Sequence, residues 1–308
     1  MCYNICIQSR TLRGGTHKMR HAERQVVPMY LIQTRENLCP GVVRMDIEAP
    51  LIAKKAQPGQ FIILRANADS ERIPLTVADC DLRRGTVSII FQAVGAGTME
   101  LAAKRAGDSI CDFVGPLGKP TELEGLKSAA VIGGGVGCAI AYPIAKALHQ
   151  RGVKVHSILG FRDCSLMILK DEFEAVSDSI DIVTDDGSYG EKGLVTDPLR
   201  KALEGGADFD RVFAIGPLVM MKFVSLMTLE FLVPTTVSMN PIMIDGTGMC
   251  GGCRLTVGGE TRFACVDGPD FDGHQVDFDE AIARSSVYAP FQQKAREAAC
   301  NLYRQEVG

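Results

Sequence analysis

The stretch Ala129-Ala-Val-Ile-Gly-Gly-Gly-Val-Gly137 decides the fold class of the central part of this chain. Its apolar run, which ends at Ile132, is typical of a buried strand, and a helical pattern begins at Ala139. A glycine loop between a strand and a helix exposes backbone N–H groups at the helix N-terminus, where the helix dipole favours a pyrophosphate. The loop departs from the strict G-x-G-x-x-G pattern because Cys138 takes the last glycine position. A tight strand–helix turn without a ligand is the alternative interpretation.

The region around this loop alternates strands with helices. Strand patterns occupy 153–160, 180–184 and 211–216, and helical patterns occupy 139–150, 170–174 and 193–203. Repeated βα units predict a parallel sheet that binds ligands at the carboxyl ends of its strands. We therefore expect an α/β domain over 124–232, with Gly216 and Pro217 at the end of its last strand. Met220 and Met221, in the helix that follows, are expected to pack in the core rather than to contact a cofactor.

Residues 29–123 show short β-branched runs separated by turn signals, which predict a small antiparallel barrel. Within it, Arg72-Ile-Pro-Leu-Thr76 places an arginine suited to a phosphate beside a hydroxyl suited to a ring nitrogen. Gly95-Ala-Gly97-Thr98 offers free amides to a pyrophosphate. The alternatives are a surface arginine in the first stretch and a helix N-terminus capped by Thr98 in the second.

A third distinctive stretch is Asp245-Gly-Thr-Gly-Met-Cys250-Gly-Gly-Cys253, which is followed by Cys265. Six glycines lie between Asp245 and Gly259, and glycine lets a backbone fold tightly around a small inorganic centre. The spacing matches the C-x4-C-x2-C…C pattern of plant-type [2Fe–2S] loops, with aspartate in the first position. Asp245, Cys250, Cys253 and Cys265 are therefore candidate cluster ligands. Zinc, which also accepts C-x2-C pairs and carboxylate oxygen, remains an alternative, as does a purely structural role.

The composition is that of an ordinary globular protein. With 308 residues, 46% of them hydrophobic and 23% charged, the chain is expected to hold two or three domains. Its net charge of −4 and the lack of a basic stripe argue against nucleic acid as a partner. Eleven scattered cysteines without a preceding signal peptide favour a reducing cytoplasm over a disulfide scaffold. The uncharged segment from Ser128 to Ala145 contains several glycines and Pro143, which argues against a membrane span.

The two ends of the chain differ from its middle. Residues 1–28 contain five Lys or Arg and one acid, Glu23, without an apolar period, so we expect a leader without stable structure and a natural start near Met29. A polar helical pattern runs from Phe278 to about Val307. We therefore assign 233–280 to a cluster domain and 281–308 to a C-terminal helix.

Several stretches together resemble one family, the electron-transfer subunits of ferredoxin–NADP reductase type, which include the iron–sulfur flavoprotein subunit of dihydroorotate dehydrogenase. The matching stretches are Gln57-Pro-Gly-Gln-Phe61, Arg72–Thr76, Val131–Gly137 and Thr184-Asp-Asp-Gly-Ser-Tyr-Gly190. Met243–Cys253 and Phe263–Asp279 are similar to the small subunits of NADH-dependent reduced ferredoxin:NADP oxidoreductases, also called sulfide dehydrogenase β-subunits. The resemblance extends from Met29 to the C-terminus.

The resemblance implies a multidomain fold: an antiparallel β-barrel FAD domain, an α/β parallel-sheet NAD-binding domain and a small iron–sulfur domain. The FAD phosphate, isoalloxazine and ribityl region would be held by the motif of Arg72, Pro74, Leu75 and Thr76, and the pyrophosphate by Gly95, Gly97 and Thr98. NAD(P)H would lie at Gly133, Gly134, Gly135, Gly137, Gly216 and Pro217. The [2Fe–2S] cluster would be held by Asp245, Cys250, Cys253 and Cys265.

The family also implies the activity and the partners. These subunits are NAD(P)H-dependent oxidoreductases without an acid–base triad, because their cofactors do the chemistry. Such a subunit pairs with a larger flavoprotein that carries further FAD and [4Fe–4S] clusters, with ferredoxin as a possible further partner. The complex couples NADH and reduced ferredoxin to NADP reduction by electron bifurcation. The alternative function within the family is electron transfer to dihydroorotate dehydrogenase in pyrimidine synthesis.

Two positions depart from the family's patterns. The dihydroorotate dehydrogenase subunit is expected to have cysteine as its first cluster ligand, and this chain has Asp245, a harder ligand that should change the cluster's potential. Ferredoxin reductases usually have Cys-Gly after the last strand of the nicotinamide domain, where this chain has Gly216-Pro217. A hypothesis from another functional class, a zinc-stabilised nucleotide-binding regulator without redox activity, predicts a colourless protein.

Overall fold

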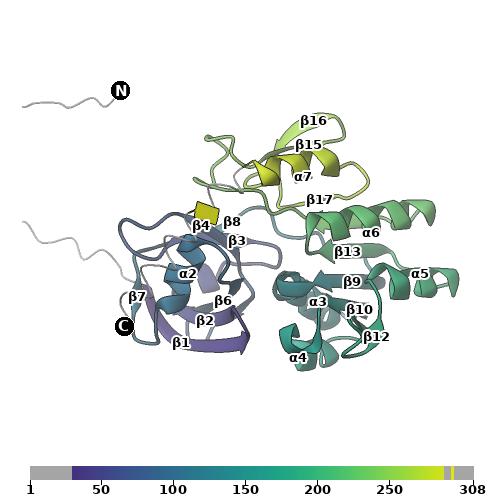
Figure 1. Cartoon of the computed structure of the whole chain (residues 1–308), viewed down its shortest axis with the longest axis horizontal. Helices are drawn as coiled ribbons and strands as arrows, with labels where there is room; N and C mark the ends of the chain where they lie inside the picture. Colours follow the sequence, from purple (N-terminus) through teal and green to yellow (C-terminus); the bar gives the residue numbers. More distant parts are fainter. Residues whose placement is uncertain (1–29, 288–292, 295–308) are drawn as a thin grey trace, which may run out of the picture.

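The computed structural model describes residues 30–287 and 293–294. Figure 1 shows an N-terminal body of antiparallel strands beside a body in which helices cover a central sheet. A smaller C-terminal segment lies across both of them. The chain is thus a multidomain protein built on sheets. The expected leader, 1–28, lies outside the described residues.

The N-terminal body contains two antiparallel sheets that share one hydrophobic core. The larger sheet has the order β5-β6-β2-β1-β7 and the smaller one the order β4-β3-β8. Buried side chains from both sheets, among them Met45, Leu64 and Phe113, pack together between them. The elements are β1 (Tyr30–Cys39), β2 (Val42–Glu48), α1 (Pro50–Ala53), β3 (Phe61–Arg65), β4 (Ile73–Thr76), β5 (Asp79–Asp81), β6 (Thr86–Gln92), α2 (Ala96–Ala103), β7 (Ser109–Ile110) and β8 (Asp112–Leu117).

The second body is an α/β unit around a seven-stranded sheet with the order β12-β11-β10-β9-β13-β14-β17. All neighbouring strands are parallel except β14 and β17. The elements are β9 (Ser128–Gly134), η1 (Gly135–Gly137), α3 (Cys138–Gln150), β10 (Lys154–Phe161), η2 (Cys164–Leu166), α4 (Lys170–Glu174), β11 (Ser179–Thr184), β12 (Glu191–Lys192), α5 (Thr196–Glu204), β13 (Arg211–Ile215), α6 (Leu218–Glu230), β14 (Thr235–Ser238) and β17 (Asp270–Asp272). The predicted alternation of strands and helices is confirmed.

Each face of this sheet has its own core. The face under α3 and α4 is filled by residues such as Val131 and Phe213, and the face under α5 and α6 by residues such as Ile132 and Met221. Residues that alternate along β9 therefore point to opposite faces, which explains why this strand is apolar throughout. Complete burial of a side chain such as Phe213 contributes about 1.5–3 kcal/mol.

The sheet extends beyond residue 232, the end expected for the α/β domain. Strand β14 continues it after Pro234, and β17, from the cysteine-rich part of the chain, closes its edge in antiparallel pairing. The rest of that part forms a hairpin, β15 (Arg254–Val257) and β16 (Glu260–Phe263), and then α7 (Phe278–Ser286). The α/β body and the predicted cluster domain therefore share one sheet, and the expected domain borders remain predictions.

The uncharged segment 128–145 is divided among β9, η1 and α3. None of the helices within the described residues has both the length and the apolar character needed to cross a membrane. The C-terminal helix predicted to reach Val307 begins as α7, and most of the remainder lies outside the described ranges.

Candidate cofactor sites

The glycine loop lies at the point where the order of the parallel strands reverses. From β9 the chain moves through α3 to β10 on one side, whereas β13 flanks β9 on the other. Gly133 and Gly134 end β9, and Gly216 and Pro217 follow β13. In open parallel sheets, ligands bind in the crevice at such a switch point. The structure thus brings together all the residues predicted to hold NAD(P)H, and we call this place the switch crevice.

Three glycines of the loop are required by close contacts or by backbone conformation. A Cβ at Gly137 would lie 2.5 Å from the carbonyl oxygen of Ile215, and a Cβ at Gly133 would lie 2.7 Å from Sγ of Cys138. Gly135 has φ +55, the left-handed conformation that glycine adopts without strain. The loop therefore packs directly on the end of β13, as a backbone does when it approaches a dinucleotide closely.

Met220 and Met221 differ in their surroundings. Met221 is completely buried in the core under α6, as the sequence predicted. Met220 is partly exposed, and its thioether is so close to Gly134 and Gly216 that a Cβ on either glycine would collide with it. Met220 packs against the same core cluster as Met221, as the sequence predicted, and its side chain also fills the space beside Gly134 and Gly216.

The stretch predicted to hold FAD lies on β4, at the edge of the three-stranded sheet. Pro74 and Leu75 pair with Ile63 and Ile62 of β3, and proline is tolerated there because an edge strand need not donate every N–H. Arg72 precedes the strand and is exposed. Within the described ranges no carboxylate forms an ion pair with Arg72, so its guanidinium is available to a phosphate.

The N-terminus of α2 is already occupied by polar groups of the chain. Thr98 Oγ1 accepts hydrogen bonds from the N–H groups of Val94 and Gly95 and donates one to the carbonyl of Gly95. The capping role considered for Thr98 is therefore present. The Gly97 N–H donates to the carboxylate of Glu71 at 2.7 Å. A side-chain carboxylate thus stands where a pyrophosphate oxygen was predicted, which shows that this helix end accommodates an anion.

The two predicted nucleotide sites are neighbours. Helix η1 of the glycine loop contacts β6, the strand that leads to Gly95. Strand β4, which follows Arg72, also contacts β6. Residues of the N-terminal body, including Val42 and Ile90, pack in the same core as α3. A flavin along β4 and a nicotinamide in the switch crevice would consequently lie next to each other.

The four predicted cluster ligands form two side-chain pairs. Asp245 accepts hydrogen bonds from the N–H groups of Thr247 and Cys250 at 2.8 Å, and from the Cys250 thiol. Those bonds, the one from Thr247 above all, lower the pKa of Asp245. Cys253 and Cys265 are buried and hydrogen-bonded to each other. A [2Fe–2S] cluster takes two ligands on each iron, so one such pair would serve each iron.

Burial, together with Cys253 and the charge of Asp245, raises the pKa of Cys265 to about 12, although the Gly248 N–H opposes the shift. Because ligating cysteines are thiolates, metal binding must supply the positive charge that removes these protons. Within the described residues, no three His, Cys, Asp or Glu side chains come close enough together to hold a single metal ion. The sulfur-rich donor set and the surrounding glycine amides fit a cluster.

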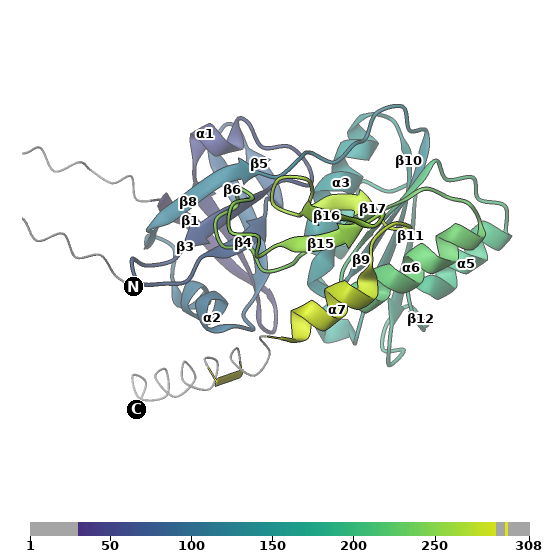
Figure 2. The same cartoon turned by 90° about the horizontal axis from the view of Figure 1, so that it is seen from above.

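The cysteine loop packs on the sheet that carries the predicted FAD stretch. A Cβ at Gly246 would lie 2.8 Å from Ile63 of β3 and 2.8 Å from Leu117 of β8. Cys253 and Cys265 belong to the same buried cluster as Phe61 and Ile63. Figure 2 shows β15 and β16 lying over the junction of the two bodies. The stretch predicted to hold FAD lies on β4, which is the direct neighbour of β3, and β3 is a strand that the cysteine loop contacts.

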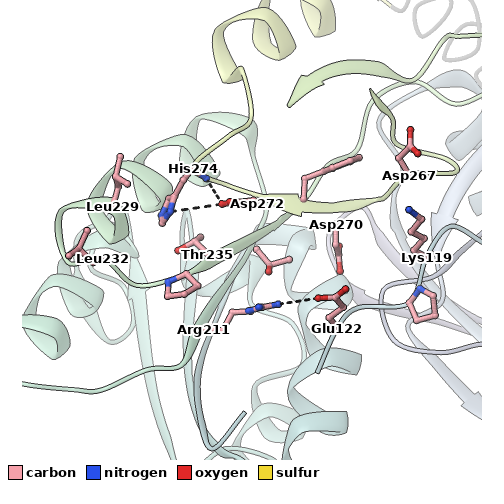
Figure 3. Close-up of a pocket in the computed structure, with 14 residues that line it drawn as sticks. Lys119, Glu122, Arg211, Leu229, Leu232, Thr235, Asp267, Asp270, Asp272 and His274 are labelled. Atoms are coloured by element: carbon pink, nitrogen blue, oxygen red, sulfur yellow. Dashed lines mark hydrogen bonds and ion pairs between the residues drawn. The ribbon is translucent and has the colours of Figure 1, made fainter. Parts of the chain in front are cut away.

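A groove of about 570 Å³ lies at the opposite edge of the sheet, where β13 and β14 begin. Figure 3 shows Arg211 directed toward Glu122, with Asp270 beside them. Burial raises the pKa of Asp270, while hydrogen bonds from Thr121 and Ser238 act in the other direction. Asp270 Oδ1 and Arg211 Nε are buried and have no hydrogen-bond partner among the residues that the structure describes. No motif in the sequence predicts this groove, because residues far apart in the chain line it.

The comparisons with known proteins agree on one family. The sequence profile of the iron–sulfur cluster binding domain of dihydroorotate dehydrogenase B matches residues 240–277. A homologue of the electron transfer subunit of dihydroorotate dehydrogenase B (NAD(+)) from Thermotoga maritima is 50% identical over 242 residues, which cover 79% of this chain and 85% of the relative. The electron transfer subunit from Bacillus caldolyticus is 35% identical and covers 75% of this chain and 91% of its own.

Solved structures support the same assignment. A chain of the NADH-dependent reduced ferredoxin–NADP oxidoreductase, a structure that addresses flavin-based electron bifurcation, is 44% identical with a TM-score of 0.83, and the match covers 88% of this chain and 98% of that one. The cytochrome b5 reductase domain of Ulva prolifera nitrate reductase, with 16% identity and a TM-score of 0.54 over 66% of this chain and 92% of that one, shares the fold. The resemblance seen in the sequence is confirmed: the chain belongs to the family of dihydroorotate dehydrogenase B electron-transfer subunits and their homologues.

Proposed function

We propose that this chain is the electron-transfer subunit of a flavin iron–sulfur oxidoreductase, with FAD, NAD(P)H and a [2Fe–2S] cluster as cofactors. It acts in NADP reduction coupled to NADH and ferredoxin. The contiguity of three sites supports this proposal most strongly: the switch crevice and the FAD stretch adjoin β6, and the cysteine loop packs on β3 and β8. Similarity to the NADH-dependent reduced ferredoxin–NADP oxidoreductase structure adds to it.

The two antiparallel sheets form the FAD-binding barrel. Arg72 binds the FAD phosphate, while Leu75 and Thr76 line the isoalloxazine and ribityl region. The amides of Gly95 and Gly97 face the pyrophosphate once the carboxylate of Glu71 has moved away. Thr98 holds the loop in shape through its bonds to Gly95. The glycine loop and Gly216-Pro217 hold NAD(P)H.

Asp245, Cys250, Cys253 and Cys265 hold the cluster, and the glycine amides around them donate to sulfur. When bound, FAD exchanges electron pairs with the nicotinamide and the cluster carries single electrons. The chain's own contribution is to bury Cys253 and Cys265 against Ile63 and to keep Asp245 ionised. A carboxylate in the ligand set should give a potential different from that of four thiolates.

The partner is a larger flavoprotein subunit that carries FAD and [4Fe–4S] clusters in the cytoplasm, with ferredoxin as a further partner. Two large apolar side chains near Cys250 in the sequence are exposed, as Cys250 itself is: Met249 is 88% exposed and Ile244 is 54% exposed. Exposed apolar side chains next to a redox centre favour a protein partner over solvent at this place.

A second candidate function is electron transfer to a dihydroorotate dehydrogenase, because the matching cluster profile and several relatives belong to that enzyme. Asp245 in place of a cysteine speaks against it. Isolation of the complex from its own cells distinguishes the two. A large FAD/[4Fe–4S] flavoprotein supports the first function, and a catalytic subunit that oxidises dihydroorotate supports the second.

The cofactor assignment is tested with anaerobically purified full-length protein. We expect flavin absorption with a broad iron–sulfur shoulder, and a paramagnetic signal at low temperature after dithionite reduction. The Cys253→Ser variant should lose iron and that signal but keep FAD, whereas Cys164→Ser, at an exposed cysteine outside the loop, should keep both. A colourless zinc protein, or normal cluster content in Cys253→Ser, would contradict the assignment.

A further inference from the structure

Helix α6 is apolar all round, although the rest of the described chain covers only part of it. Its only charged residues are Lys222 and Glu230. A helix that is apolar on every side is normally buried on every side. Helix α6 packs on β13 and β14 and also contacts α5 and α7. Away from the sheet it exposes a row of apolar side chains: Val219, Phe223, Leu226 and Leu229 are each between 48% and 55% exposed, and Leu232, just after the helix, is 84% exposed.

These five side chains form one row, which we call the α6 stripe. Their spacing of three or four residues places the members within the helix on one side of it. Leu229 and Leu232, at the C-terminal end of the row, line the same edge of the groove shown in Figure 3. A contiguous apolar patch on a protein surface marks a contact site.

Leu232 gives an independent indication of a contact. It follows α6 with φ +57, the left-handed conformation in which glycine is the usual residue after a helix. The Val233 N–H donates to the Thr228 carbonyl, as is usual at such a helix end. A large side chain strains this backbone, and Leu232 buries too little of its surface within the chain to offset the strain. The leucine therefore points to a contact outside the isolated chain.

The α6 stripe is complementary to itself in an antiparallel arrangement. Leu226 lies at its middle, so a two-fold axis there brings each residue level with one that lies equally far from Leu226 in the other direction on a second copy. Phe223 is then level with Leu229 of the second copy. Lys222 is level with Glu230, so opposite charges lie at the same height on the two helices at both ends of the contact.

Charged groups of both signs frame the stripe. Lys222 pairs with Asp279 of α7 at 2.6 Å, and Glu230 pairs with Arg200 of α5 at 3.4 Å. An apolar centre with a polar rim is the usual composition of a protein–protein interface. A rim that carries both signs suits a surface with the same mixture of charges, as a second copy of this chain has, better than an anionic membrane.

We propose that the α6 stripe is the contact surface of a homodimer, in which α6 of a second copy packs against it in antiparallel orientation with Leu226 at the two-fold axis. The cysteine loop packs on β3 and β8 of the N-terminal body, whereas α6 belongs to the α/β body (Figure 1). The dimer therefore leaves the proposed docking place of the larger flavoprotein free. This inference does not depend on the proposed function.

Sedimentation velocity of the full-length, FAD-loaded protein, from micromolar to submillimolar concentration, tests the dimer. We expect the wild type to dimerise reversibly. Phe223→Glu should raise the dissociation constant of the dimer about thirtyfold or more, because it places a charge in the apolar centre. Leu82→Glu, at a leucine of the N-terminal body that is 71% exposed, is the matched control and should dimerise like the wild type. Circular dichroism verifies that both variants fold.

Exchange of the two charges tests whether the partner is a second copy in the proposed orientation. Lys222→Glu and Glu230→Lys should each weaken the dimer about tenfold, since the two-fold axis repeats each contact, and the double variant should regain most of the lost affinity. The two residues lie about 12 Å apart along one helix, too far for a contact within one chain, so only an intermolecular pair explains the regain. A monomeric wild type, a Phe223→Glu variant that dimerises normally, or a double variant without regain would overturn the inference.

Discussion

Replacement of Gly137 by alanine should separate the glycine loop from β13. The backbone at Gly137 is helical, with φ −59 and ψ −21, a conformation in which alanine is normally preferred. A Cβ at this position would lie 2.5 Å from the Ile215 carbonyl oxygen and 2.8 Å from the Cα of Gly216. Both are backbone atoms, which cannot rotate away as the end of a flexible side chain does. The strand or the loop must therefore move.

The size of the effect follows from two opposing contributions. Overpacking of a tight interior costs about 1–3 kcal/mol. Alanine in place of glycine in helical backbone returns about 0.5–1 kcal/mol. The middle values of these two ranges leave a net destabilisation of about 1 kcal/mol. In domains of about 150–250 residues each kcal/mol changes the unfolding midpoint by about 2–4 °C, so we expect a decrease of about 2–4 °C.

Thermal unfolding monitored by circular dichroism gives the midpoint, and calorimetric titration with ADP-ribose gives the affinity of the crevice. Gly95→Ala is the control for unfolding, because its Cβ would meet nothing closer than Thr98 Oγ1 at 3.8 Å. We expect Gly137→Ala to weaken ADP-ribose binding as well as to lower the midpoint. An unchanged or higher midpoint with normal ADP-ribose affinity would refute the close-contact argument.

Three further predictions concern the acidic residues. Glu71→Gln should raise FAD affinity about threefold to tenfold, because the charged group that accepts the hydrogen bond of the Gly97 amide is lost. Fluorescence titration of the apoprotein with FAD measures this affinity. Equal affinities of the variant and the wild type would mean that the pyrophosphate does not bind this amide. Burial raises the pKa of Asp270, which lies beside Arg211, so the native state binds the proton of this carboxyl group more tightly than the unfolded chain does. The stability that comes from this tighter proton binding is fully present below pH 3.8 and is lost as the pH rises through the native pKa. The unfolding midpoint of Asp270→Asn should therefore rise relative to that of the wild type as pH increases from about 4. A difference between the two midpoints that does not depend on pH would exclude ionisation of Asp270 as its cause. Asp245→Cys should keep a cluster with a shifted potential, and an identical redox titration would remove Asp245 from the ligand set.

Much of the fold followed from local signals. The run that ends at Ile132 is apolar because both faces of β9 are buried, and the glycines after it mark the turn into α3. The ligand spacing from Asp245 to Cys265 likewise depends only on the sequence, and the structure places these residues in one loop region. Their assignment as ligands, like the individual FAD and NAD(P)H contacts, remains a prediction.

The features of the fold and of the sites that the sequence did not predict depend on contacts between distant parts of the chain. Strand β17 consists only of Asp270, Phe271 and Asp272, which is too short for a hydrophobic period to identify it, and its backbone pairing with β14 makes it a strand. Nothing in the sequence near Gly97 indicates that Glu71, which lies on another segment, bonds to its amide. Methionines in an apolar helix predict core packing, which Met220 and Met221 both show, but only the three-dimensional structure reveals that Met220 also lies against Gly134 and Gly216.

The sharing of one sheet between the α/β body and the cysteine-rich segment has a practical consequence for protein engineering. A fragment that stops at residue 232 would lack both β14 and β17 and would leave the backbone groups along one side of β13 unpaired. It would also remove the backbone bond from Lys119 to Gly268, which ties the connection between the two bodies to the tail. Unpaired strand edges recruit other chains, so such a fragment would aggregate. The cysteine loop therefore cannot be transferred to another protein by itself, and a chimera that includes it must also include the strands of this sheet.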